Sequence, residues 1–267
     1  MNNINPNYSI KIVEYIFKLT NRNLRIGWIS LSGRNYSGRI CVHHRGGGNK
    51  RSYYYLDIYR RINCYGRLIR KFKLFHYSAL IGLILYENGL MNYILLSEIT
   101  DMEKKIYSGS TGYKIPLTPG SALSLVHLKL FSKISFIEVY PFYGSLLARA
   151  AGTSAVLTGH LPDAVTIKLR SGWNFKISNN CIATIGGASN HLHKSVPKAK
   201  AGFVRSLGIR PTVRGVAMNP CDHPHGGGEG KKSPPAAAKT PWSRLSKGTA
   251  TVKKVLNRKK KWFSKNK

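Results

Sequence analysis

The stretch LIGLILYENGLMNYILL, residues 80–96, decides the fold of this chain. Two apolar segments flank Glu87-Asn88-Gly89, and an Asn-Gly pair in that setting is the strongest short-range signal of a β-hairpin. Asparagine and glycine tolerate the positive φ angles that a tight hairpin turn requires. We therefore predict two antiparallel strands, Leu80–Tyr86 and Met91–Leu96.

Further short strands are predicted on both sides of this hairpin. They are Arg39–His43, Tyr53–Ile58, Ala155–Thr158, Val165–Arg170 and Trp173–Ser178. Several of them alternate apolar and polar residues, which places the apolar side chains on one face of a sheet. Short strands separated by glycine turns are typical of small closed β-barrels, so we predict an all-β fold. The one stretch predicted to be helical is Ser145–Ala151.

The composition indicates a partner with a high negative charge. The 267 residues include 43 Lys and Arg against 10 Asp and Glu, a formal net charge of +33. A charge of this size repels itself unless a polyanion neutralises it. Hydrophobic residues still make up 42% of the chain, which is enough to bury a core. These values argue against a free-standing metabolic enzyme and favour a nucleic acid or an acidic membrane surface as the partner.

The basic residues are concentrated in two flanks. Residues 39–73 carry ten basic side chains against one acid, and residues 198–267 carry eighteen against two. Between them, residues 74–140 carry five lysines and five acids, as an ordinary folded domain would. After about Ala201 the apolar periodicity disappears, so this segment cannot bury enough apolar surface to order itself.

Two glycine-rich motifs lie in these flanks. The first is GRICVHHRGGGNKR, residues 38–51, and the second is RPTVRGVAMNPCDHPHGGGEG, residues 210–230. Each joins arginine and histidine to three consecutive glycines. Glycine lets backbone N–H groups approach phosphates closely, and arginine offers a bidentate fork. Neither motif matches GxxxxGK[ST] or GxGxxG, so we predict contacts with a polyphosphate chain rather than with a nucleotide.

Catalysis and metal binding are the alternative interpretations of the second motif. Asp222 beside His223 has the ingredients of a general base, but adjacent residues rarely point at each other and no nucleophile stands nearby. Cys221, His223 and His225 lack a fourth ligand and the spacing of a zinc site. We therefore expect no catalytic residue, no metal site and no enzyme activity.

These motifs resemble those of the universal large-subunit ribosomal protein L2 family. The stretch Asn219–Gly230 is highly specific for that family, and Gly38–Arg51 is similar to its N-terminal segment. Leu147–Thr153 and Leu169–Gly172 match its middle, so that the resemblance covers roughly Gly33 to Val252. It implies an OB-fold-like barrel followed by an SH3-like barrel, with basic extensions threaded into large-subunit rRNA.

The resemblance implies a division into four parts. They are an N-terminal extension (1–37), an OB-fold-like RNA-binding domain (38–125), an SH3-like barrel (126–203) with an insertion near 126–138, and a basic rRNA-threading extension (204–267).

The implied function is that of a structural constituent of the large subunit, which binds its rRNA and supports the peptidyl transferase region and subunit association during translation. The implied partners are large-subunit rRNA, neighbouring ribosomal proteins and small-subunit rRNA at an intersubunit bridge. We expect no membrane span and no cofactor, apart from Mg²⁺ shared with rRNA. A free basic RNA-binding protein or RNA chaperone remains the alternative, and a basic membrane-surface helix at Val252–Phe263 is a weaker one.

The residues predicted to contact rRNA come mainly from the two motifs. They are Arg39, His44, Arg45, Gly46, Gly47, Gly48, Lys50, Arg51, Arg149, Arg210, Arg214, Asn219, Asp222, His223, His225, Gly226, Gly227, Gly228 and Trp242. Trp242 stands in the tail, where it has no core of its own, and is the better stacking candidate. Tyr53-Tyr54-Tyr55 is predicted to pack on alternate faces of a strand instead.

The chain departs from the family's pattern in three places. Tyr77 stands where the family usually has an arginine, and Pro141-Phe142-Tyr143-Gly144 lacks the family's lysine. Val126–Glu138 is longer and more apolar than its counterpart. Together with the N-terminus, rich in tyrosine and asparagine, these departures predict a diverged organellar version. We expect it in the mitochondrial ribosome, with a plastid or the bacterial cytoplasm as alternatives.

Overall fold

The computed structural model describes residues 24–98, 100, 102, 104–110, 118–228, 237–248 and 263–264. The chain divides into two units. The barrel unit comprises Met1–Trp28, Arg51–Pro197 and Trp262–Lys267, and the extension unit comprises Ile29–Lys50 and Lys198–Lys261. Apart from Phe263, the segment Val252–Phe263 lies outside the described residues. The four predicted parts of the chain stay a prediction.

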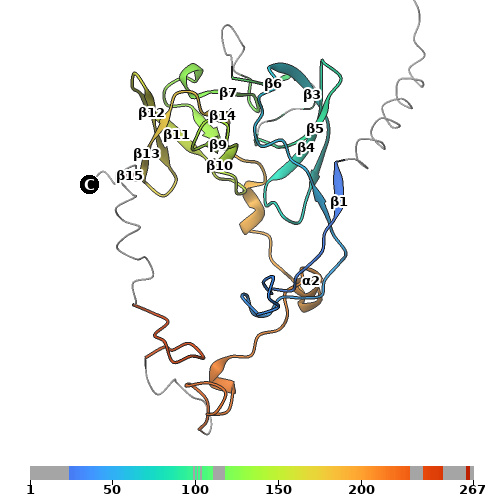
Figure 1. Ribbon diagram of the computed structural model, residues 1–267, viewed down its shortest axis with the longest axis vertical. Helices are drawn as coiled ribbons and strands as arrows, with labels where there is room; N and C mark the ends of the chain where they lie inside the picture. The colour runs from blue at the N-terminus through green and yellow to red at the C-terminus, as the bar shows by residue number, and fades with distance from the viewer. Residues whose placement is uncertain are drawn as a thin grey trace, which may run out of the picture. The chain divides into compact units, whose positions relative to one another are not determined.

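Antiparallel strands make up most of the barrel unit (Figure 1). One large sheet has the order β15-β13-β12-β11-β8-β14-β7-β6-β3-β4-β5. Its strands are β3 (Cys64–Lys73), β4 (Leu80–Tyr86), β5 (Met91–Leu95), β6 (Ile106–Ser108), β7 (Ala122–Ser124), β8 (Lys133–Ser135), β11 (Ala155–His160), β12 (Ala164–Leu169), β13 (Asn174–Ser178), β14 (Ile182–Ile185) and β15 (Phe263–Ser264). The predicted all-β fold is confirmed.

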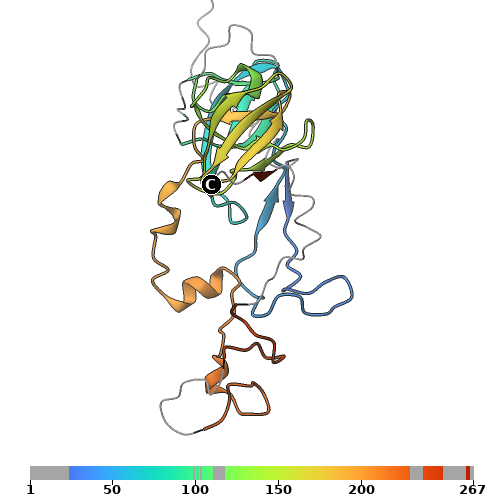
Figure 2. The same ribbon diagram turned by 90° about the vertical axis from the view of Figure 1, so that its left-hand side faces the viewer.

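Two smaller pairs complete the sheets. β1 (Arg25–Gly27) pairs with β2 (Ser52–Tyr54), and β9 (Ile137–Glu138) pairs with β10 (Ser145–Leu147). The helices of the described residues are short: η1 (Leu125–His127), η2 (His191–Lys194), α2 (Ala201–Ser206) and η3 (Gly215–Ala217). None of the helices within the described residues is long and apolar enough to cross a bilayer. Figure 2 shows the strands of the barrel unit after a 90° turn.

The predicted hairpin is confirmed as β4 and β5, which pair in antiparallel register. Gly89 closes the turn with a φ of +83°. Ile81 and Leu83 on one face and Ile84 on the other are fully buried, because separate apolar clusters cover the two faces. A strand buried on both faces has a nearly continuous apolar sequence, and residues 80–86 have one.

A third apolar cluster lies between the strands from β7 to β14. Val165 and Ile167 of β12 are fully buried in it, as their alternation predicts. Leu169, the third apolar residue on that face, is half-buried at the edge of the same cluster. Burial also raises the pKa of the Cys181 thiol to about 12, and the nearby Glu138 adds to the shift.

Arg60 is buried where the two groups of strands meet. β6 and β7 run parallel and pair at Ser108 and Ala122. The Arg60 guanidinium donates to Ser108 Oγ at 2.7 Å, and to the carbonyl oxygens of Tyr107 at 3.1 Å and Gly120 at 3.2 Å. Tyr107 and Ser108 belong to β6, and Gly120 lies just before β7, so that one side chain ties the two strands together.

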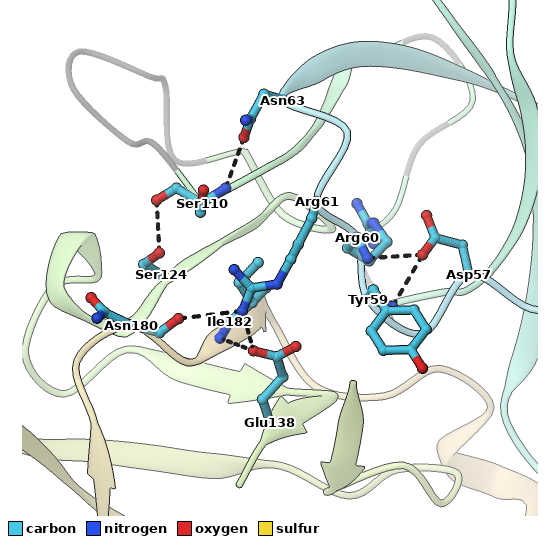
Figure 3. A network of polar contacts seen from close by, with 10 residues as sticks. All are labelled: Asp57, Tyr59, Arg60, Arg61, Asn63, Ser110, Ser124, Glu138, Asn180 and Ile182. Atoms are coloured by element: carbon cyan, nitrogen blue, oxygen red, sulfur yellow. Dashed lines mark hydrogen bonds and ion pairs between the residues drawn. The ribbon is translucent and has the colours of Figure 1, made fainter. Parts of the chain in front are cut away.

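The neighbouring Arg61 forms the buried ion pair seen in Figure 3. Its Nη2 lies 2.7 Å from Glu138 Oε2, and the Glu138 side chain is only 1% exposed. The same Oε2 accepts a hydrogen bond from the Ile182 backbone N–H at 2.9 Å. On its other side the Arg61 guanidinium lies 4.0 Å from the centre of the Phe142 ring.

Two predicted elements are wrong. Ser145–Ala151 contains good helix formers, but Ser145–Leu147 forms β10 and Ala148 takes a φ of +52°. Pairing with β9 overrides the local preference, as tertiary contacts commonly do. Arg39–His43 forms no strand: Ile40 makes only an isolated bridge with Arg34, and the chain then bends, because the N–H groups of Cys41 and Val42 both donate to the Gly33 carbonyl.

The predicted alternation of the three tyrosines is confirmed. Tyr54 packs in a core cluster, where its ring centre lies 5.1 Å from that of Tyr93. Tyr53 contacts Tyr55 at the opposite face, and Tyr55 is 52% exposed.

Replacing Glu138 by glutamine should lower the free energy of unfolding by about 2–3 kcal/mol, because it leaves the largely buried Arg61 charge without its partner. The control is Glu87→Gln in the exposed pair with Lys105, which should change stability by less than about 1 kcal/mol. Urea unfolding of the full chain, followed by circular dichroism, measures both. Equal effects of the two substitutions would contradict a structural role for the buried pair.

Candidate nucleic-acid interface

The first glycine motif lies beside the segment that leads into the second motif. The Gly46 N–H donates to the Gly208 carbonyl at 3.0 Å, and the Arg210 N–H donates to the His44 carbonyl at 2.9 Å. These residues are more than 150 positions apart in the sequence. The fold of the extension unit therefore brings the two predicted motifs together.

Glycine is required at Gly48 by the chain's own backbone. Gly48 has a φ of +93°, and a Cβ there would lie 2.8 Å from both the Gly208 nitrogen and the Ser206 oxygen. The next residue, Asn49, donates its N–H to that Ser206 oxygen at 3.1 Å. The triple glycine thus lets two segments pack backbone against backbone.

Around this junction the cationic side chains point into solvent. The exposed cations predicted as phosphate contacts are Arg39, Arg45, Lys50, Arg210 and Arg214, and His44 beside them is exposed as well. Asp222 is the one acid among the described residues of the extension unit. Long, exposed and nearly uncompensated cations are what a phosphate backbone requires of its partner.

The second motif forms a loop closed by its own backbone. The Asn219 carbonyl accepts hydrogen bonds from the N–H groups of Asp222 at 3.0 Å and His223 at 3.3 Å. The Gly227 N–H donates to the Met218 carbonyl at 3.1 Å, which closes the other side of the loop. The Asn219 and Asp222 side chains stay exposed at its surface.

Both histidines of the loop use ring nitrogens for internal hydrogen bonds. His223 is buried, and its Nδ1 accepts a hydrogen bond from the His225 backbone N–H at 3.0 Å. The Nε2 of the half-buried His225 accepts one from the Lys239 backbone N–H at 3.0 Å. A Cβ on Gly215 would lie 2.6 Å from the His223 ring. The histidines thus hold the loop and the following segment in shape.

The three consecutive glycines of the loop are required for different physical reasons. Gly227 and Gly228 have φ angles of +82° and +86°, which other residues rarely adopt. Gly226 has an ordinary φ, but a Cβ there would collide with the Asn219 backbone. Its constraint comes from the protein itself.

Trp242 lies near the first motif and is 67% exposed. Its ring centre is 5.7 Å from that of His43. The tail therefore places an open indole face beside the cations of the first motif, where a base can stack.

Two predicted contacts belong to the barrel unit. Arg51 is half-buried, with its guanidinium 3.0 Å from the centre of the Phe75 ring. Arg149 is half-buried as well, and its guanidinium lies 5.8 Å from the Tyr77 ring. Tyr77 stands where the family usually has an arginine, and in this chain its ring lies beside another arginine, Arg149.

Both places also contain residues that no sequence motif predicted. The backbone of Ser206 and Gly208 contacts the first motif, and Arg205 stands directly before it. The sequence feature that could have indicated these residues is an arginine and a glycine shortly before the second motif. Phe75 and His76 were missed although they stand between two strands, where exposed aromatic residues are unusual. No three His, Cys, Asp or Glu side chains among the described residues converge so that they could hold a metal ion.

Comparison with known proteins matches most of the chain. Residues 21–108 match the family described as Ribosomal Proteins L2, RNA binding N-terminal domain, and residues 118–243 match Ribosomal Proteins L2, C-terminal domain. The chain is 39% identical to large ribosomal subunit protein uL2 of Bartonella quintana over 229 residues, which cover 85% of this chain and 82% of the relative.

Two further relatives carry the same description. The protein of Orientia tsutsugamushi is 42% identical over 233 residues, with 87% of this chain and 84% of the relative covered. The protein of Alcanivorax borkumensis is 41% identical over 220 residues, with 82% and 79% covered.

The hydrogen bonds of the loop predict a different tautomer for each histidine. At a pH where both rings are neutral, His223 should carry its proton on Nε2 and His225 on Nδ1, because the other nitrogen of each ring accepts a backbone hydrogen bond. Long-range ¹H–¹⁵N correlation spectra of the full chain distinguish the two forms. Gly215→Ala should displace His223 and return its ring to the tautomer mixture of a free imidazole, whereas Gly202→Ala, with no atom within 4 Å of the new Cβ, should leave the spectra unchanged.

Proposed function

The chain belongs to the ribosomal protein L2 family, and from this premise we propose how its surfaces act in the large ribosomal subunit. As a member of this family it is a structural, RNA-binding protein of that subunit. We propose that the extension unit binds the phosphate backbone of large-subunit rRNA, and that the second motif supports the peptidyl transferase region. Contacts with neighbouring ribosomal proteins, and with small-subunit rRNA at an intersubunit bridge, would then assist subunit association.

The observation that carries this proposal is the junction of the two glycine motifs. Hydrogen bonds from Gly46 and Arg210 fix the two segments side by side, so that exposed cations from distant parts of the chain form one array. Such an array can follow a folded RNA backbone, because its spacing is set before the RNA binds. Bridging Mg²⁺ held mainly by rRNA phosphates is compatible with it, and the protein supplies no cluster of metal ligands among its described residues.

The second motif supports rRNA structure in this proposal and does no chemistry. One ring nitrogen of His223 and one of His225 are occupied by hydrogen bonds that shape the loop. A general base needs a free nitrogen aimed at a reacting proton, and burial of His223 works against that access. We therefore assign the loop a structural role.

We propose the mitochondrial ribosome as the compartment. The named relatives are bacterial ribosomal proteins, and their uL2 descriptions support a ribosomal location. Tyr77 and the Phe142-Tyr143 loop, which depart from the family's pattern, support an organellar version. Co-sedimentation of the chain with large subunits from a mitochondrial extract tests the placement, and a chain found mainly in the soluble fraction would favour the free RNA chaperone instead.

Salt dependence tests the phosphate contacts. If the five exposed cations named above each meet one phosphate, log K for large-subunit rRNA should fall against log [salt] with a slope of about −4, because each contact contributes about −0.7 to −0.9. Binding of the full chain to an rRNA transcript, titrated at increasing KCl, gives the slope. A slope that corresponds to one or two contacts would refute the proposed array.

Gly227→Ala tests the loop. The new Cβ would meet the Pro220 ring at a φ of +82°, which strains the backbone by about 1–3 kcal/mol. We expect the full-length variant to enter large subunits poorly, as measured by its share in the subunit peak of a density gradient. Gly202→Ala is the control, because it adds a methyl group in open space at an ordinary φ. Equal incorporation of the two variants would show that the loop's shape is dispensable.

A further inference from the structure

The barrel unit has a surface on which aromatic rings and arginines alternate. It is built from β1 and β2, from the connection between β3 and β4, and from the turn after β10. Its members are Trp28, Arg51, Tyr53, Tyr55, Phe75, His76, Tyr77 and Arg149, and we call it the aromatic–arginine surface. Only Arg51 and Arg149 among these residues were predicted to contact RNA.

The rings of this surface are held by one another. The ring centres of Trp28 and His76 lie 4.2 Å apart, and those of Trp28 and Tyr53 lie 6.0 Å apart in a stacked arrangement. Tyr53 in turn meets Tyr55 edge to face at 5.8 Å. Because the rings support each other, little side-chain freedom remains to be lost when a ligand binds.

Much of this aromatic area faces solvent. Trp28 is 44% exposed, Tyr55 is 52% exposed and Phe75 is 48% exposed. Large aromatic side chains usually bury most of their surface, and a group of exposed ones marks an interaction site.

Arginines flank the rings. The Arg51 guanidinium covers one face of Phe75 at 3.0 Å from the ring centre, and the Arg149 guanidinium lies 5.8 Å from the Tyr77 ring. None of the residues that form the surface is acidic.

His76 acts in this surface as an aromatic ring. Burial lowers its pKa and the positive charge of Arg51 lowers it further, while a hydrogen bond with the Ser52 backbone opposes the shift. The imidazole is therefore neutral near pH 7, and it stacks with Trp28 without adding charge. The positive charge of the surface comes from its arginines.

We propose that the aromatic–arginine surface binds an unpaired segment of RNA. Bases stack on the exposed rings of Trp28, Tyr55 and Phe75, and the arginines at the edges meet the flanking phosphates. The area suits about two or three bases, the number that a sheet surface with such rings typically stacks. This inference rests on the proposed function, and it adds a site that neither glycine motif contains.

The chemistry favours RNA over a protein partner. Every unpaired base offers a π-face, and aromatic rings combined with arginines are the arrangement that single-stranded nucleic acid requires. A duplex hides its base faces and would find only the phosphate contacts here. A protein partner would in addition need acidic side chains to meet Arg51 and Arg149.

The test compares a single-stranded RNA decamer with a duplex RNA of equal length, both bound to the full chain. At about 0.5 M KCl the phosphate contacts of the extension unit are weakened and stacking remains. Trp28→Leu, Tyr55→Leu and Phe75→Leu should each weaken binding of the decamer about 5- to 100-fold. The salt slope and the duplex affinity should stay as in the unaltered chain.

Matched controls separate stacking from folding. Tyr140→Leu removes a ring that is 58% exposed elsewhere in the barrel unit and should not change decamer binding. Trp28→Phe keeps a ring and should retain most of the affinity that Trp28→Leu loses. Arg51→Gln should reduce the salt slope by about 1, since it removes one phosphate contact.

Three results would overturn the inference, and they can be told apart. Decamer binding by the three leucine variants at the level of the unaltered chain would remove this site while leaving rRNA binding by the extension unit intact. A benzophenone cross-linker placed at Tyr55 in assembled large subunits that captures a protein instead of rRNA would show that the surface docks a protein. Failure of the unaltered chain to prefer large-subunit rRNA over an unrelated RNA would remove the proposed function, and this site with it.

Discussion

The buried guanidinium of Arg60 is the constraint on which the barrel unit depends. Its side chain is only 5% exposed and donates to oxygen atoms of Tyr107, Ser108 and Gly120. A charge inside a protein is tolerated only when its donors find acceptors, and here they are found just where β6 meets β7. The parallel pair itself is short, and the three hydrogen bonds of Arg60 reinforce the place where it forms.

Arg60 and the adjacent Arg61 stabilise two different parts of the barrel unit. Asp57 Oδ1 accepts the backbone N–H groups of Tyr59 and Arg60 (Figure 3) and so fixes the turn from which both side chains leave. Arg60 enters the junction of β6 and β7, and Arg61 pairs with the buried Glu138. A chain with a net charge of +33 thus uses some of its cations as internal structure.

Other cations lie at the protein surface, in two different settings. In the extension unit they stand exposed around closely packed glycine backbones, where a phosphate chain can approach them. On the barrel unit Arg51 and Arg149 lie against aromatic rings, which limits their motion and adds stacking faces. One protein therefore offers RNA both a phosphate-binding array and a platform for bases. The two respond differently to salt, because phosphate contacts depend on counterion release and stacking does not.

The sequence by itself determined the strands whose signal is local. Apolar runs around Asn88-Gly89 and the alternation of Val165 and Ile167 specify hairpin and face, because turn chemistry and a period of two residues need no distant partner. The motif at residues 219–230 likewise identifies the family from a contiguous stretch. Tertiary structure alone decided that Ser145–Leu147 pairs as a strand, that Gly48 packs against Gly208, and that Trp28, Phe75 and Arg149 share one surface. Those outcomes depend on contacts between residues far apart in the chain. The packing of the whole unit determines these contacts, and no periodic pattern in the sequence indicates them.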